Sequence, residues 1–122
     1  MGQKTYTVAE ANALLPYLAP ALVELREKFE QAAAIRVAVA KAAAMNGGSP
    51  EREEWSSTLA RVADLLNRLQ EWAVELRDVA TGLVDFPTQI EAEEAYLCWR
   101  LGEPEVGYWH RRGEGFAGRN PL

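Results

Sequence analysis

Apolar residues recur at helical spacing without a break from Trp55 to Ala80, and this pattern constrains the fold more than any other feature of the sequence. Successive members are four or three residues apart, which is the spacing of a heptad seam. The seam consists of Trp55, Leu59, Val62, Leu66, Leu69, Ala73, Leu76 and Ala80. A flanking stripe consists of Leu65, Trp72 and Val79. We therefore predict one helix over residues 51–80, with an apolar surface wider than a two-stranded coiled coil needs.

The sequence before this seam predicts a partner helix over residues 8–45. Thr7 and Glu10 have the spacing of a capping box, in which each side chain bonds the backbone N–H of the other residue. A helix is therefore expected to begin at Val8. Its predicted buried stripe consists of Leu18, Leu22, Leu25 and Phe29.

Two prolines fall inside this first helix. Pro16 and Pro20 each lack the backbone donor that a helix interior uses. We therefore predict a short segment over residues 8–14, then a bend, and then a long segment over residues 17–45. Residues 46–50 contain two glycines and a proline, which are typical of a helix end followed by a helix start. The two helices should form an antiparallel hairpin.

After Gly82 the period of the apolar residues changes from helical to alternating, which indicates strands. Residues 83–90 and 95–101 carry apolar side chains at alternate positions, and the polar residues 91–94 are expected to form the turn between them. Residues 106–110 are either a third short strand or a short helix, and five residues do not separate these alternatives.

These elements predict a single α+β domain over residues 1–122. A long antiparallel helical hairpin is followed by a small C-terminal antiparallel β-meander over residues 83–110, packed near the open end of the hairpin. Residues 111–122 are expected to be an ordered tail. Pro87 lacks an N–H group, so the first strand should be an edge strand or carry a bulge there.

The composition excludes several classes of protein. A formal net charge of −5 is unfavourable for binding nucleic acid or anionic membranes. A single cysteine excludes an intrachain disulfide and fits a reducing compartment. No apolar run approaches the ~20 residues of a membrane span, and the first residues lack the apolar core of a signal peptide. We expect a cytoplasmic protein with no nucleic-acid partner, no membrane partner and no cofactor.

The side chains best suited to ligand binding gather in the C-terminal part of the chain. We predict that Arg100, Glu103, His110 and Arg119 form a patch for a small anionic ligand, or for a metal held by His110 and Glu103. The alternative, which we prefer, is an ion-pair network that fixes the C-terminal tail.

Cys98 is interpreted as a structural residue, because it lies between Leu97 and Trp99 in a strand-like run. A structural zinc site needs four Cys or His ligands at close spacing, and this chain has two such residues in total. A catalytic cysteine needs an exposed, electropositive setting. We therefore assign no catalytic residue and no metal ligand.

Four segments carry a resemblance to a known family: GLVDFP at residues 82–87, YLCWRLGEPEVGYWH at 96–110, GFAGRNPL at 115–122, and YTVAEANALLPYL at 6–18. They resemble a bacterial and archaeal family that is catalogued only as a domain of unknown function. The likeness covers essentially the whole chain. It implies a complete family member, and it brings no activity, substrate or cofactor.

The surplus apolar stripe of the second helix needs a cover, which is either the β-region or a second copy of the chain. We expect a non-enzymatic cytoplasmic binding or assembly module that forms a homodimer through its helices. The alternative is a small-anion-binding or metal-binding protein, or an enzyme, with its site in the C-terminal β-region.

Overall fold

The computed structural model describes residues 4–45 and 51–122, so the predicted loop at 46–50 lies outside the described residues. Two helices, α1 (Val8–Met45) and α2 (Glu51–Glu71), are followed by a five-stranded sheet. The strands are β1 (Glu75–Asp78), β2 (Leu83–Ile90), β3 (Glu93–Arg100), β4 (Tyr108–Arg111) and β5 (Asn120–Pro121), with a 3-10 helix η1 (Phe116–Gly118) before β5. The predicted α+β class is confirmed.

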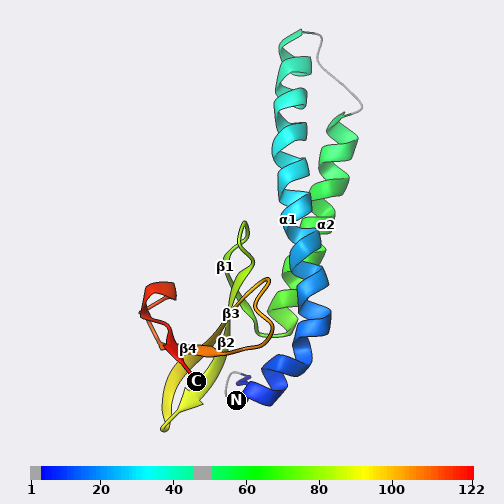
Figure 1. Cartoon of the computed structure of the whole chain (residues 1–122). Coiled ribbons are helices and arrows are strands. Elements are labelled where there is room, and N and C mark those ends of the chain that lie inside the picture. Colours follow the sequence, from blue (N-terminus) through cyan, green and yellow to red (C-terminus); the bar gives the residue numbers. More distant parts are fainter. Residues whose placement is uncertain (1–3, 46–50) are drawn as a thin grey trace.

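Figure 1 shows the helical hairpin as a rod, with the sheet beside the end of the rod where α1 begins and α2 ends. Each strand pairs antiparallel with the next strand along the chain, from β1 to β5. The sheet is therefore a meander near the open end of the hairpin. The third predicted segment is the strand β4 and not a helix. None of the helices in the described ranges combines the length and the apolar character that crossing a membrane requires.

The helix α1 begins with the predicted capping box and continues through both prolines. The Thr7 N–H donates to Glu10 Oε1 at 2.9 Å, and the Glu10 N–H donates to Thr7 Oγ1 at 3.1 Å. No break occurs at residue 14, so the prediction of a separate first segment was wrong. The first turns of α1 run at an angle to the rest of the helix (Figure 1), as expected where proline removes a backbone donor.

The helix α2 ends at Glu71, nine residues before the predicted end at Ala80. Ala73 has φ of 59° and lies two residues after Glu71, at the position where glycine is usual. The Ala73 N–H donates to Gln70 O at 2.9 Å, and the Val74 N–H donates to Leu69 O at 3.0 Å, which together form a Schellman motif. The chain then leaves as strand β1, so the predicted helix over 72–80 is a turn and a strand.

The buried face of the hairpin is rotated by about one residue from the predicted seam on α2. The buried residues of α2 are Thr58, Val62, Leu65 and Leu69, and they face a buried stripe of α1 that contains Leu18, Leu22 and Leu25. Three residues that the sequence assigned to buried stripes, Phe29, Leu59 and Leu66, remain 41%, 41% and 38% exposed. The hairpin therefore keeps apolar surface in contact with solvent.

Alternation along the strands gives the sheet two different faces. The face toward the helices contributes Val84, Phe86, Leu97 and Trp99 to the main core. Asp85 and Cys98 point to the opposite face, and both are buried. The second face of the sheet therefore also carries buried side chains, and some of them are polar.

Pro87 lies in β2, at a position that β1 does not cover. The strand β1 pairs only with residues 83–85 of β2, so at Pro87 the outer side of β2 has no ladder strand. Tyr6 takes this place, and its N–H donates to Pro87 O at 2.7 Å. The Thr88 hydroxyl donates to Tyr6 O at 2.6 Å, which ties the segment before α1 to the sheet.

Candidate metal centre

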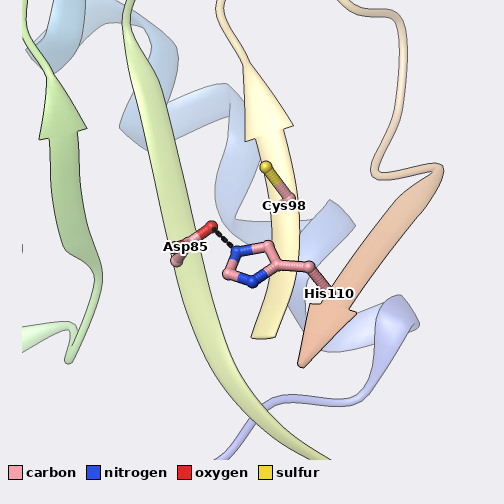
Figure 2. A group of neighbouring side chains, drawn as sticks. All are labelled: Asp85, Cys98 and His110. Atoms are coloured by element: carbon pink, nitrogen blue, oxygen red, sulfur yellow. Dashed lines mark hydrogen bonds and ion pairs between the residues drawn. The ribbon is translucent and has the colours of Figure 1, made fainter. Parts of the chain in front are cut away.

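Three neighbouring strands bring Asp85, Cys98 and His110 together on the second face of the sheet. Asp85 on β2 lies opposite Cys98 on β3, and His110 on β4 lies opposite Tyr96, two residues from Cys98. Each residue is at most 2% exposed. One carboxylate oxygen, the thiol sulfur and one ring nitrogen lie within 4.8 Å of one another. Figure 2 shows the three side chains converging from their separate strands.

Both ring nitrogens of His110 face oxygen acceptors. Nδ1 lies 2.8 Å from the backbone oxygen of Arg111, and Nε2 lies 2.9 Å from Asp85 Oδ1 (Figure 2). A carbonyl oxygen accepts hydrogen bonds, so Nδ1 is placed to donate to Arg111, and Nε2 lies against the Asp85 carboxylate. The Nδ1 bond also fixes the ring so that Nε2 points at the cluster, as in many metal-ligating histidines.

Arg77 holds the second oxygen of Asp85. Arg77 Nε donates to Asp85 Oδ2 at 2.7 Å, and Arg77 Nη2 donates to Glu75 Oε1 at 3.3 Å. The bond with Asp85 raises the pKa of Arg77 above its usual value, and burial opposes this increase. Asp85 therefore has a nitrogen partner at each oxygen, which compensates for the burial of its charge.

Cys98 is a protonated thiol in this environment. Burial raises the pKa of Cys98 to about 11, and the charge of Asp85 adds to this increase. A nucleophilic cysteine needs a thiolate and a histidine nitrogen that can take its proton. Here both His110 nitrogens already bond oxygens, and the thiolate fraction is very small at neutral pH. The Cys–His–Asp combination is therefore not a nucleophilic triad in this geometry.

A cavity of about 430 Å³ opens beside the cluster. Asp85 and His110 form part of its wall, and Cys98 does not. The remaining lining residues are Glu75, Arg77, Tyr96, Arg112, Gly113 and Gly115. Cys98 thus lies behind the other two donors, and the open side of the cluster faces the cavity.

The structure divides the four predicted site residues into two groups. Arg119 forms two hydrogen bonds with the Glu103 carboxylate, at 2.6 and 3.0 Å, and Glu103 also accepts from the Arg100 backbone N–H at 2.7 Å. The Arg100 guanidinium instead lies over the Phe116 ring, at 5.6 Å. His110 turns to Asp85, so the prediction that it joins these three residues was wrong.

The geometry around Arg119 resembles the predicted ion-pair network. Its guanidinium lies 4.1 Å from the ring centre of Tyr108 and 4.7 Å from that of Phe116, and its side chain is 10% exposed. Burial alone raises the pKa of Glu103, but the bonds from Arg119 and the Arg100 N–H give a net decrease. Arg119 thus connects the tail to the turn after β3.

Comparison with protein families gives one match. A family model described as "Uncharacterized conserved protein (DUF2203)" matches residues 4–122. The chain belongs to the DUF2203 family. No curated protein and no solved structure matches it. The predicted resemblance to a family of unknown function is thereby confirmed.

Sequence reasoning did not assign Asp85, Cys98 and His110 to one site in this DUF2203 chain. Asp85 is the only charged residue within LVDFP, so it stands out as an acid in an otherwise apolar part of a strand. Cys98 was identified but was interpreted as a structural residue. Arg77 was missed because the sequence placed it in a helix. Asp85, Cys98 and His110 can be recognised as one site only from strand register, since all three lie on one face of adjacent strands.

Proposed function

We propose that the protein is a metal-binding domain that holds one divalent transition-metal ion between Asp85, Cys98 and His110. The single observation that carries this proposal is the burial of three different donor groups, from three adjacent strands, within 4.8 Å of one another. Buried polar groups are costly unless they are paired. A thiol, an imidazole and a carboxylate that converge in one buried place are a typical ligand set.

The donor types select the class of ion. Thiolate and imidazole favour zinc and its neighbours over calcium or magnesium, which prefer oxygen ligands. Three protein ligands with a fourth open position are usual in zinc sites that bind a further molecule. In such a site the ligand atoms are roughly 3.3–3.6 Å apart. The longest separation in the cluster would therefore have to shorten by about 1 Å, and the 2.9 Å between Asp85 Oδ1 and His110 Nε2 would have to lengthen slightly, which small side-chain rotations would provide.

The ion would displace the proton of the Cys98 thiol. A metal binds the thiolate form of cysteine, and burial holds Cys98 in the thiol form when no metal is bound. Asp85 can then offer Oδ1 to the metal while Oδ2 keeps its bond to Arg77. Arg77 thus orients the carboxylate as an outer partner of the metal.

The test is metal binding by chelator-treated protein, followed by native mass spectrometry and elemental analysis. We expect the chain to take up one Zn²⁺ or Co²⁺ ion, and to release protons as it binds, because the Cys98 thiol has to ionise. The cobalt form should show a thiolate charge-transfer band. Cys98→Ser should lose this band, whereas Asp78→Asn, which changes an exposed carboxylate on β1, should keep it. Wild-type protein that binds no more metal than Cys98→Ser would contradict the proposal.

Self-association through the hairpin is a second candidate function, and the exposed apolar residues favour it. Three exposed apolar residues, Phe29 on α1 and Leu59 and Leu66 on α2, lie about one residue further along their helices than the buried stripes. Because the helices are antiparallel, this displacement turns both stripes toward the same side of the hairpin. A second copy carries an identical stripe, so a two-fold dimer would bury both.

Sedimentation equilibrium tests this second candidate. We expect wild-type protein to be a dimer, and the double variant Leu59→Glu and Leu66→Glu to be a folded monomer, because charges would enter the shared surface. Circular dichroism reports whether the variant keeps its helices. A wild-type chain that remains monomeric at high concentration would exclude hairpin-mediated dimerisation.

A further inference from the structure

We infer that the cavity beside the cluster binds a small oxyanion, with one oxygen on the metal ion and the others on arginine. This inference rests on the proposed metal site and adds the class of ligand that the site would take. It starts from the position of the cavity. Asp85 and His110 line it, so an ion held between them lies at its wall with the fourth coordination position facing inward.

The composition of the lining selects a polar ligand. Apart from Asp85 and His110, the wall consists of charged residues, one tyrosine and two glycines. A volume of about 430 Å³ lies toward the small end of the range for ligand pockets. Most ligand pockets are lined mainly by apolar side chains. This lining instead suits a compact molecule whose surface is mostly oxygen.

Arg77 is placed to bind such a ligand. Its Nε and Nη2 atoms donate to Asp85 and Glu75, and 42% of its side-chain surface remains exposed. Its guanidinium plane also lies 5.2 Å from the centre of the Tyr96 ring, which restrains it. An arginine fixed on one edge presents its other N–H groups in a defined direction, which matches the geometry of an oxyanion.

Arg112 supplies a second positive charge at the rim of the cavity. Its Nη1 bonds Glu94, and both side chains are largely exposed, so this ion pair is weak and its remaining N–H groups can turn to a ligand. Gly113 and Gly115 follow with φ of 88° and 69°, conformations that glycine adopts without strain. They let the chain pass along the cavity without side chains that would fill it.

The neutral charge balance of the ligated metal explains why an anion would be favoured there. An ion with two positive charges, the Asp85 carboxylate and the Cys98 thiolate sum to zero, and His110 is neutral when it ligates. Among the remaining lining residues, Arg77 and Arg112 carry two positive charges and Glu75 carries one negative charge, so the wall keeps a net positive charge. A water molecule at the open position would therefore be exchanged for an oxyanion, since the anion contacts both the metal and the arginine.

The experiment uses the cobalt-loaded protein after removal of unbound metal, titrated with inorganic phosphate at constant ionic strength. We expect a saturable change in the cobalt d–d spectrum that sodium chloride does not produce. Arg112→Ala should weaken phosphate binding about five- to tenfold, because one charged hydrogen-bond donor is lost from an exposed position. Arg100→Ala is the matched control, since Arg100 is also exposed but lies over Phe116, outside the cavity lining.

The outcomes separate the two proposals. If cobalt is not bound through Cys98, the proposed metal site is wrong and the anion site is wrong with it. If cobalt is bound but phosphate leaves its spectrum unchanged, the anion inference is overturned while the metal site stands. Equal weakening by Arg100→Ala and Arg112→Ala would also overturn the inference, because it would indicate attraction to general surface charge.

Discussion

Replacing Asp85 by alanine is expected to lower the free energy of unfolding of the metal-free protein by about 3 kcal/mol. Asp85 is 1% exposed and accepts one hydrogen bond from Arg77 and one from His110. Removing the carboxylate leaves the buried His110 side chain without the anion that it contacts. The loss should lie at the low end for a broken buried pair, because Arg77 is partly exposed and can reach water. Urea denaturation in the presence of a chelator measures the change.

Asp78→Ala is the control for this prediction. Asp78 accepts hydrogen bonds from the Thr81 N–H and hydroxyl, but it is exposed at the end of β1. Water can replace both bonds, so the loss of stability should be much smaller. Equal losses for Asp78→Ala and Asp85→Ala would mean that the buried network around His110 contributes no special stability.

Leu65→Ala is expected to lower the free energy of unfolding by about 3 kcal/mol, whereas the neighbouring change Leu66→Ala should cost less than about 1 kcal/mol. Leu65 is 0% exposed against α1, so its truncation leaves a cavity in the hairpin. Leu66 is 38% exposed, so water fills the space that it leaves. The measurement is denaturant unfolding at low protein concentration, where association does not contribute.

The comparison of Leu65→Ala with Leu66→Ala tests which of the two residues lies in the buried seam of α2. The sequence assigned Leu66 to the main seam and Leu65 to its flank, and the structure has the reverse order of burial. If Leu66→Ala proves more destabilising than Leu65→Ala, then the spacing of apolar residues describes the hairpin better than the structure does.

Hydrophobic periodicity predicted the helices, the change to strands and the α+β class, because each depends on which residues avoid water. It did not predict the end of α2. The apolar spacing continues through Leu76 and Ala80, yet the helix stops where Ala73 adopts a positive φ. Nothing in an alanine side chain signals that conformation, which glycine usually provides. The end is determined by backbone bonds of Ala73 and Val74, and by the packing of β1 on β2.

The site was only partly predictable, because its composition depends on strand register. The sequence suggested a four-residue turn over 91–94, which would place Asp85 opposite Arg100. The turn consists of Glu91 and Ala92, with φ of 53° and 66°, and it places Asp85 opposite Cys98. A two-residue shift keeps a side chain on the same face of the sheet and changes its partner. Asp85 therefore lies on the same face of the sheet in both registers, and only its partner on the next strand differs.

The cluster also draws all its donors from a local part of the chain. Asp85, Cys98 and His110 lie on consecutive strands, each paired with the next one along the chain, so only short loops separate them. The two helices, by contrast, come together from residues as far apart as Glu24 and Arg61. An ion that binds the cluster would therefore join three neighbouring strands to one another and would not cross-link the sheet to the helical rod.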